Sequence, residues 1–206
     1  MGMSLMKKTG GLILAAGLSS RMGDYKQLMK IEGRSMVGCV VDMMRNAEIE
    51  LIVIVTGYRH EELEEHLKND QVEFVFNPNY ETTQQLDSLK LGLKALQGRC
   101  DRIVMTPADI PLVQSETVKK LLTLEADIIR PVYHGEPGHP IVLNPEWIPY
   151  IMAYDGPEGL KGAIERSSCS VQEMDVEDRG VIMDNDTKKD FERLLFWYQE
   201  KRICTK

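Results

Sequence analysis

The sequence lacks a C-x-x-C pair, a long apolar run and a signal-peptide pattern. Its four cysteines stand far apart, at Cys39, Cys100, Cys169 and Cys204. Thiols with this spacing argue against a zinc cluster or a disulfide scaffold. No stretch reaches the roughly 18 apolar residues of a membrane span, and the opening MGMSLMKK is not followed by the apolar core of a signal peptide. We therefore expect a cytoplasmic protein with no membrane partner.

An excess of basic charge is also missing. The 25 Lys and Arg residues are outnumbered by 32 Asp and Glu residues, which gives a net charge of −7. A general nucleic-acid binder needs a basic face, so we expect no nucleic-acid partner. Hydrophobic residues make up 43% of the 206 residues, enough for a folded core. Because no repeat, low-complexity tract or linker interrupts the chain, we predict a single domain over residues 1–206.

Short apolar runs alternate with helical patterns through most of the chain. Strands are predicted by apolar, often β-branched runs at 10–16, 51–57, 72–76, 101–106 and 127–133. Helices are predicted by apolar residues at helical spacing at 35–46, 60–69, 83–96, 115–124 and 188–201. Residues 135–164 indicate one more strand and two short helices. This alternation predicts right-handed crossovers and a mainly parallel sheet.

The loop after the first predicted strand, in LAAGLSSRMGDYK at residues 14–26, has a composition suited to an anion. Gly17 lets the backbone approach a ligand, and Ser19 adds a hydroxyl. Arg21 can grip phosphate oxygens in a bidentate manner, and Lys26 adds a mobile positive charge. The glycine spacing fits neither a Walker P-loop nor a dinucleotide fingerprint. The alternative is an ordinary turn with solvated charges.

A carboxylate follows another predicted strand, in MTPADIPLV at residues 105–113. Ligands of open parallel sheets bind beyond the carboxyl ends of the strands, so this loop is expected near the first one. Pro107 and Pro111 stiffen it and hold Asp109 in place. A carboxylate facing a phosphate needs a cation between them, and Mg²⁺ takes one or two carboxylates plus phosphate oxygens. Alternatively, Asp109 caps a turn or helix.

Taken as ordered strings, these two loops resemble the signatures of the molybdenum cofactor nucleotidyltransferases. The matching patterns are L-A-A-G-x-S-x-R-M-G-x-x-K and P-A-D-I-P-L-V. The resemblance implies a Rossmann-like three-layer α/β/α fold with a mainly parallel sheet, of the nucleotide-diphospho-sugar transferase (glycosyltransferase-A-like) type. It assigns catalytic roles to Arg21, Lys26 and Asp109, with Mg²⁺ on Asp109. It implies nucleotide contacts from Leu14, Ala15, Ala16, Gly17, Ser19, Arg21, Lys26, Asn77 and Ser88.

Two later stretches extend the resemblance. PGHPIVL, at residues 137–143, looks like the family's acceptor segment, which would place Gly138, His139 and Pro140 at the acceptor. VIMDNDTKKDFERL, at 181–194, resembles the family's D-[IL]-D-T-P ending, so Asp184 or Asp186 would supply the second carboxylate to the metal. Here Asn185 replaces an apolar residue and Lys188 replaces the proline, which leaves the inward-facing aspartate undetermined. Asp186 or Thr187 can also cap the last helix.

The resemblance implies transfer of a nucleotide from an NTP to an acceptor phosphate, with release of pyrophosphate. Cytidylyl members read L-A-A-G at the first loop, and the methyl group of Ala16 narrows the base pocket, so CTP is the expected donor. The expected acceptor is molybdopterin, with a molybdenum-dependent oxidoreductase as a possible client of the product. Lys161 replaces an arginine of the family, which changes how an acceptor phosphate is held. The alternatives are a GTP-using enzyme, a sugar-phosphate or polyol-phosphate nucleotidyltransferase, and a non-catalytic molybdenum cofactor chaperone.

Overall fold

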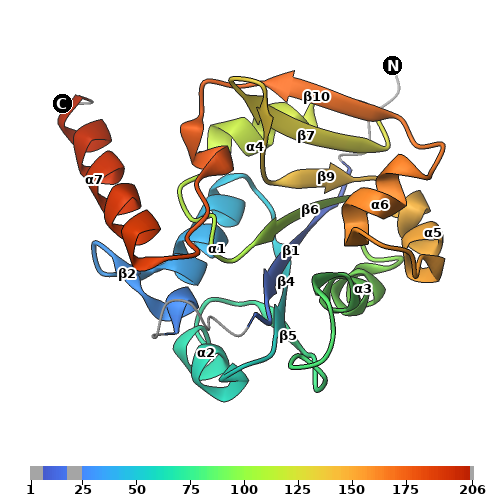
Figure 1. Ribbon diagram of the computed structural model, residues 1–206, viewed down its shortest axis with the longest axis horizontal. Helices are drawn as coiled ribbons and strands as arrows, with labels where there is room; N and C mark the ends of the chain where they lie inside the picture. The colour runs from blue at the N-terminus through green and yellow to red at the C-terminus, as the bar shows by residue number, and fades with distance from the viewer. Residues whose placement is uncertain (1–6, 18–24, 205–206) are drawn as a thin grey trace.

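The computed structural model describes residues 7–17 and 25–204, and within them an eight-stranded sheet with helices on both faces (Figure 1). The strand order is β10-β7-β9-β6-β1-β4-β5, and β8 pairs with β7. Its strands are β1 (Thr9–Ala15), β4 (Leu51–Thr56), β5 (Glu73–Phe76), β6 (Arg102–Pro107), β7 (Ile128–Tyr133), β8 (Glu136–Pro137), β9 (Ile141–Leu143) and β10 (Val171–Asp175). The helices are α1 (Met36–Asn46), α2 (His60–His66), α3 (Gln85–Leu96), α4 (Ser115–Leu122), α5 (Ile148–Ala153), α6 (Gly159–Glu165) and α7 (Lys188–Cys204).

The sheet is mainly parallel, as predicted. Strand β1 pairs in parallel with β4 on one side and with β6 on the other. The chain runs from β1 outward to β4 and β5, and then returns across β1 to β6. The strand order therefore reverses at β1, and in open α/β sheets a ligand site lies outside the carboxyl ends at such a reversal.

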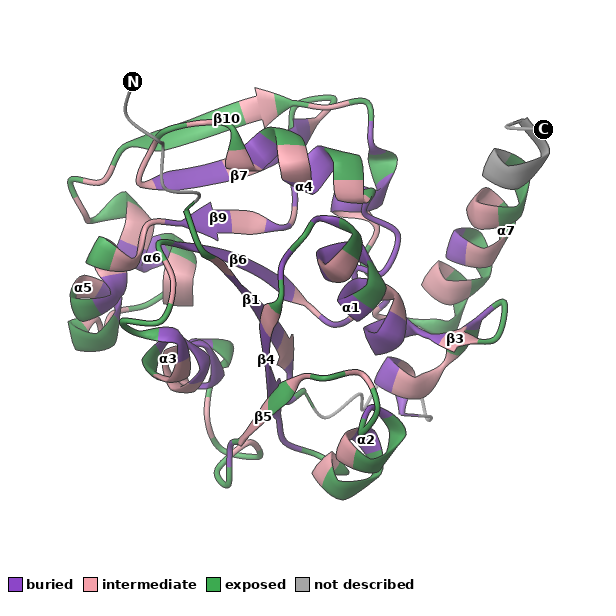
Figure 2. Ribbon diagram, turned by 180° about the vertical axis from the view of Figure 1, so that it is seen from behind, coloured by how far each residue is buried: buried purple, intermediate pink, exposed green. Residues whose placement is uncertain are grey.

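Both faces of the central strands are buried, which explains why they read as continuous apolar runs (Figure 2). Leu12 and Val53 point to the core that contains residues of α3, α5 and α6. Ile13 and Ile54 point to the core that contains residues of α1, α2 and α4. Because neighbouring residues of a strand face opposite sides, one sheet separates two helix layers. The predicted three-layer α/β/α fold is confirmed.

Strand β9 confirms the additional strand predicted after residue 133, and it runs antiparallel between β6 and β7. Other elements escaped the sequence reading. A small hairpin forms from β2 (Lys30–Ile31) and β3 (Arg34–Ser35). Edge strand β10 is mostly exposed, so it lacks the apolar run that marks a buried strand. Three 3₁₀ turns complete the described chain: η1 (Lys26–Leu28), η2 (Pro145–Trp147) and η3 (Arg179–Ile182).

Helix α7 projects from one end of the sheet rather than covering it (Figure 1). Its buried Leu194 packs with Ile31, Met36 and Leu112 in a small separate core. Over the part of the chain that is described, no helix combines the length and the apolar character needed to cross a membrane. That residues 1–206 make up one domain stays a prediction.

Candidate active site

The two loops expected to meet at the carboxyl edge do meet. Leu14 of β1 lies opposite Pro107 of β6 in the parallel ladder. The ladder continues one step further, because the backbone N–H of Ala108 donates to the carbonyl of Leu14 at 3.0 Å. Asp109 is thus held by β6 directly beside the exit of β1.

Lys26 joins Asp109 to the C-terminal segment. Its Nζ lies 2.5 Å from Asp109 Oδ2 and 3.2 Å from Asp186 Oδ1. The side chains of Lys26 and Asp109 are only 13% and 17% exposed, which limits solvent screening of this pair. Burial lowers the pKa of Lys26, but the two carboxylates outweigh it and the net pKa is raised. Lys26 is therefore a permanent cation held between two acids.

The structure distinguishes the two C-terminal aspartates. Asp186 contacts Lys26, whereas Asp184 is an exposed residue of the same loop. Although Asp184 is exposed as a whole residue, neighbouring atoms partly desolvate its carboxyl, and this desolvation together with the charges of Asp186 and Asp109 raises its pKa. Thr187 has the capping role: its backbone N–H and hydroxyl donate to Asp190, and its hydroxyl accepts from the Asp190 backbone N–H. Asp186 is consequently not needed as the cap and turns toward Lys26.

The residues present fit a divalent cation that is shared with a phosphate. Two carboxylates, Asp109 and Asp186, already converge on one positive centre, the ammonium of Lys26. Over the described residues, no group of three or more His, Cys, Asp or Glu side chains is placed to hold a metal without further ligands. This donor set suits Mg²⁺, which binds one or two carboxylates and completes its shell with phosphate oxygens and water. It does not suit a metal that needs a full protein cage.

A small cavity of about 250 Å³ opens beside this cluster. It is lined by Leu14, Ala16, Gly17, Lys26 and Asp109, together with residues of the segment that leads into α3. Ala15 is buried on the opposite side of β1, in the core with Ile13. Of the predicted nucleotide contacts from the first loop that the structure describes, Leu14, Ala16, Gly17 and Lys26 line the cavity and Ala15 does not. Ser19 and Arg21 lie outside the described residues.

Asn77 and Ser88 form one polar unit at the entry to α3. The amide nitrogen of the buried Asn77 donates to Ser88 Oγ at 3.0 Å and to Thr83 Oγ1 at 3.0 Å. Ser88 lines the small cavity from the first turns of α3. Free N–H groups at a helix N-terminus favour an anion. Asn77 therefore acts on the cavity through the side chains that it holds.

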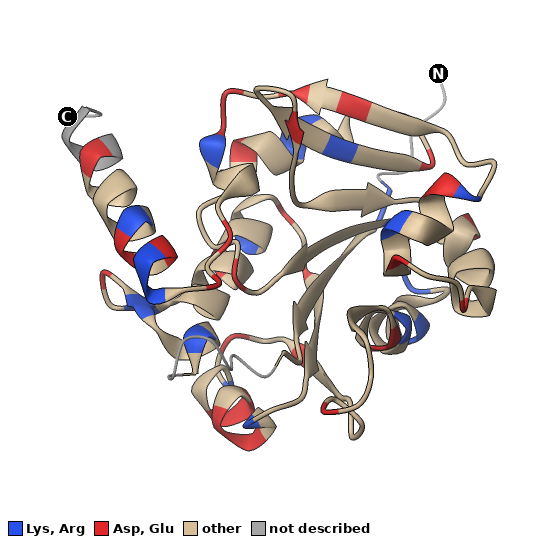
Figure 3. Cartoon of the chain, viewed as in Figure 1, with Lys and Arg blue, Asp and Glu red and all other residues tan. Residues whose placement is uncertain are grey.

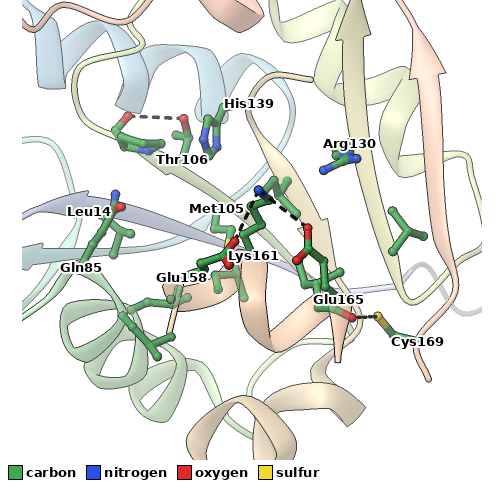
Figure 4. Close-up of a pocket in the computed structure, with 18 of the residues that line it drawn as sticks. Leu14, Gln85, Met105, Thr106, Arg130, His139, Glu158, Lys161, Glu165 and Cys169 are labelled. Carbon is green, nitrogen blue, oxygen red and sulfur yellow. Dashed lines mark hydrogen bonds and ion pairs between the residues drawn. The ribbon is translucent and has the colours of Figure 1, made fainter. Parts of the chain in front are cut away.

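A larger cavity of about 960 Å³ adjoins the small one. The two share the wall residues Leu14, Gln84, Gln85 and Pro107. Figure 4 shows His139 beside Thr106 on one side and Arg130 on another, with Lys161 between Glu158 and Glu165. Its remaining lining is largely apolar, with side chains such as Leu86, Leu160 and Ile164.

Only one of the three predicted acceptor residues lines the larger cavity, and that residue is His139. Gly138 and Pro140 are buried beside it, and a Cβ on Gly138 would lie 2.4 Å from the carbonyl oxygen of Val181. Because Gly138 has no side chain, the backbone N–H of His139 can donate a hydrogen bond to the same Val181 carbonyl at 2.8 Å. Gly138 and Pro140 thus position His139.

Several lining residues were missed by the sequence reading. Gln27 is 2% exposed, and its amide reaches the carbonyls of Ala15 and Gly17 at 3.4 Å. Arg130 lines the larger cavity from within β7, and its charge inside an apolar run could have marked it as a candidate site residue. Tyr80 lines the small cavity, but nothing in the sequence pattern set it apart.

The middle strands of the sheet are almost free of charged residues, which lie on the helices, on the loops and on edge strand β10 (Figure 3). The arrangement places a cation and two carboxylates at the small cavity and a large, mixed polar and apolar cavity next to it. Such a pair of adjoining cavities can hold two molecules in contact with each other. Holding reactants side by side is itself a large part of catalysis of group transfer.

Comparisons with known proteins agree with this geometry. The chain is 29% identical to the molybdenum cofactor cytidylyltransferase of Escherichia coli K12, over 87% of this chain and 92% of that one. It superposes on Rv0371c of Mycobacterium tuberculosis H37Rv with TM-score 0.80, 25% identity and coverage of 92% and 98%. Another structure of Rv0371c is a complex with manganese (23% identity, TM-score 0.77, coverage of 91% and 98%). A nucleotidyl transferase of Methanothermobacter has the same fold (20% identity, TM-score 0.81, coverage of 94% and 99%).

A family model supplies the remaining comparison. Residues 11–171, which include both loops of the site and most of the larger cavity, match the model of the MobA-like NTP transferase domain. This span is well over half of the 206 residues. It confirms the family resemblance drawn from the two loop strings and the expectation of an enzyme. The chain therefore belongs to the MobA-like NTP transferase family and is a nucleotidyltransferase.

Proposed function

We propose that the protein transfers CMP from CTP to the terminal phosphate of a molybdopterin-type acceptor and releases pyrophosphate. The observation that carries the proposal is the pair of adjoining cavities, with the Lys26, Asp109 and Asp186 cluster at the smaller one. The similarity to the E. coli molybdenum cofactor cytidylyltransferase supports both substrates. The 960 Å³ of the larger cavity has room for an acceptor of the size of a pterin.

In the proposed reaction, an oxygen of the acceptor phosphate attacks the α-phosphorus of CTP in line. A new P–O bond forms, the bond between the α-phosphorus and the bridging oxygen breaks, and pyrophosphate leaves with that oxygen and the electron pair. No protein nucleophile is required, so the protein contributes positioning and charge neutralisation. Lys26 pairs with Asp109 at the cavity, and its ammonium can form an ion pair with a phosphate oxygen in place of the Asp109 oxygen. Arg21 is assigned to the pyrophosphate by the loop pattern.

Mg²⁺, held by Asp109 and Asp186, would neutralise the phosphate charge and polarise the bonds to the reacting phosphorus when bound. The manganese complex of Rv0371c supports a divalent cation in this fold. Asp184, with its raised pKa, is the secondary candidate ligand. A metal held by two carboxylates and by substrate phosphates would bind weakly without nucleotide.

Selectivity for CTP is proposed from the residues that line the small cavity next to the first loop. The side chains of Leu14 and Ala16 line it together with Tyr80. A methyl group at position 16 takes space that a purine would need. The preference is therefore steric, and it should be lost with a smaller residue at that position.

The deciding experiment is a panel of CTP, GTP, UTP and ATP with Mg²⁺, read as pyrophosphate release. Each nucleotide is tested alone, with molybdenum-loaded molybdopterin, and with a sugar 1-phosphate or a polyol phosphate. We expect release only with CTP and molybdopterin. Pyrophosphate release with a sugar or polyol phosphate would show that the acceptor is not molybdopterin, and a preference for GTP would show that the donor is not CTP. Binding of molybdopterin without pyrophosphate release would indicate a chaperone.

A variant pair assigns the activity to the proposed site. Asp109→Asn should reduce turnover about 100-fold or more, because the metal loses a charged ligand next to the reacting phosphates. The matched control is Glu61→Gln, which removes an exposed acid on α2 away from both cavities. Equal activity of Asp109→Asn and wild type would refute the role of Asp109.

A further inference from the structure

We propose that Asn185 is a positioning residue that fixes the separation of the two metal-binding carboxylates, Asp109 and Asp186. The inference rests on the proposed function, because it concerns the same metal site. Asn185 stands between Asp184 and Asp186 in the chain, but its side chain contacts the other loop of the site.

The contact is a single buried hydrogen bond. The Nδ2 of Asn185 donates to the backbone carbonyl of Asp109 at 3.0 Å, across 76 residues of sequence. Asn185 is 0% exposed, so water does not compete for this bond. It fixes the peptide group that carries the Asp109 side chain. Since the next residue of the C-terminal segment is Asp186, one bond sets the placement of both carboxylates.

Other contacts between these segments lie further from Asp109, such as the hydrogen bonds that Asp178 accepts from Gln114 and Thr117. Leu112, just beyond Asp109, packs with Leu194 and with Met183 in the small core near α7. Apolar packing holds surfaces together but tolerates small sliding movements, whereas a hydrogen bond has a defined length and direction. A metal that is bound by two carboxylates from separate loops is sensitive to such movements.

The burial of this amide has a cost that points to a role. The Oδ1 of Asn185 is buried without a hydrogen-bond partner among the described residues. An unpaired buried acceptor destabilises the fold, and an apolar side chain of similar size would avoid this. A fully buried asparagine at this place is therefore explained by the bond that its other amide atom makes to Asp109.

The test compares Asn185→Leu and Asn185→Ala with wild type. The matched control is Thr56→Val, in which a buried residue loses a hydrogen bond of the same length, from Thr56 Oγ1 to Glu64 Oε1 at 3.0 Å, outside both cavities. Mn²⁺ binding is measured by electron paramagnetic resonance with CTP present and no acceptor. We expect the Mn²⁺ dissociation constant to rise about 10-fold or more in both Asn185 variants, as is typical when a residue that supports a metal ligand is removed. The control should stay within about twofold.

A second readout needs no metal. Hydrogen exchange of residues 107–113 should be faster in both Asn185 variants of the metal-free protein than in Thr56→Val, because the Asp109 loop has lost its anchor. Unchanged Mn²⁺ affinity together with unchanged exchange in folded variants would overturn the proposal. Loss of folded protein in both variants would assign Asn185 to folding and would overturn it as well.

The outcomes separate this inference from the proposed function. If wild type binds Mn²⁺ through Asp109 but releases no pyrophosphate, the proposed function fails and the role of Asn185 is still measured. If wild type releases pyrophosphate and the Asn185 variants bind Mn²⁺ as tightly as wild type, only the inference about Asn185 fails.

Discussion

Lys26 has two roles at the scale of the single residue. Without a bound nucleotide it neutralises Asp109 and Asp186, which would otherwise repel each other at the edge of the sheet. With a nucleotide present, the same ammonium is proposed to contact a phosphate. The side chain is flexible and carries a compact charge, so it can serve both partners without a change of the backbone.

Removal of Lys26 is expected to affect turnover strongly. Lys26→Ala should lower kcat about 100-fold or more, because one well-placed donor to the developing charge is lost. Pyrophosphate release with CTP and molybdopterin measures it. Lys30→Ala, an exposed lysine of strand β2, is the control and should retain full activity. A decrease in kcat of less than about fivefold in Lys26→Ala would mean that this residue does not stabilise the transition state.

His139 gives a prediction about pH. Burial lowers the pKa of His139, whereas the charge of Asp109 and a hydrogen bond to the Met105 backbone raise it. The effect of burial is the larger, so the net pKa is lowered. Its Nδ1 is buried without a partner among the described residues, so protonation there would place an unpaired charge in the protein. A depressed pKa in the folded state means that the unfolded chain binds the proton more readily. His139 therefore contributes full stability above its ordinary pKa, and the contribution is lost as the pH falls through the lowered value.

Urea unfolding from pH 7.5 down to pH 5 tests this expectation. The free energy of unfolding should decrease more steeply for wild type than for His139→Gln as the pH falls below the ordinary histidine pKa of about 6.5. His134→Gln, at an exposed position, should follow the wild-type slope. Parallel slopes for wild type and His139→Gln would contradict the buried neutral histidine.

At the scale of elements, the carboxyl ends of β1 and β4 approach each other closely. Gly57 directly follows β4, and a Cβ there would lie 2.6 Å from the Ala16 carbonyl oxygen and 2.8 Å from Tyr80 Cβ. Gly17 differs, because a Cβ at this position would meet no atom within 4 Å among the described residues. One glycine is thus required by packing, while the other leaves space at the small cavity.

This difference predicts opposite results for two equivalent substitutions. Gly57→Ala should destabilise the fold by about 1–3 kcal/mol, because backbone atoms must move apart. Gly17→Ala should leave the unfolding midpoint unchanged but weaken CTP binding about 10-fold, because the methyl group occupies space that the ligand needs. Urea unfolding and calorimetric titration with CTP measure the two effects. A destabilised Gly17→Ala protein, or one that binds CTP normally, would contradict the proposed approach of the nucleotide.

At the scale of the whole molecule, Asp178 ties the C-terminal third to the sheet. It is 3% exposed and accepts hydrogen bonds from the backbone of Gln114 at 2.8 Å and from the Thr117 hydroxyl at 2.8 Å. A third bond comes from the Gly180 backbone at 3.1 Å. The carboxylate thus connects the start of α4 with η3, the turn that precedes the Asp184–Asp186 loop.

Loss of this connection is expected to lower global stability. Asp178→Ala should reduce the free energy of unfolding by about 3 kcal/mol, because three donors lose their partner and two of them cap segment ends. Urea unfolding monitored by circular dichroism provides the measurement. Asp175→Ala, an exposed aspartate on β10, serves as the control. A reduction below about 1 kcal/mol would mean that water replaces the carboxylate.

The sequence by itself determined most of the helices and buried strands, the layer order and the two loops of the site. Continuous apolar runs at 10–16 and 101–106 predict strands that are buried on both faces, and helices between parallel strands must then cover both faces. Local chemistry also indicated Lys26 and Asp109 as site residues, because the loops that directly follow those strands have an unusual composition. Such features depend on neighbours in the chain and can be read from it.

Only the tertiary structure decided which distant groups meet. The sequence left Asp184 and Asp186 equivalent, and the fold turned Asp186 to Lys26 while Thr187 took the cap. The chain gave no sign that Asn185 would reach Asp109, or that Gly138 and Pro140 would lie behind His139 rather than in the cavity. Contacts across more than 70 residues depend on how the sheet is ordered and on which side of it each loop returns. No local pattern encodes these contacts, because they arise from packing of the whole chain.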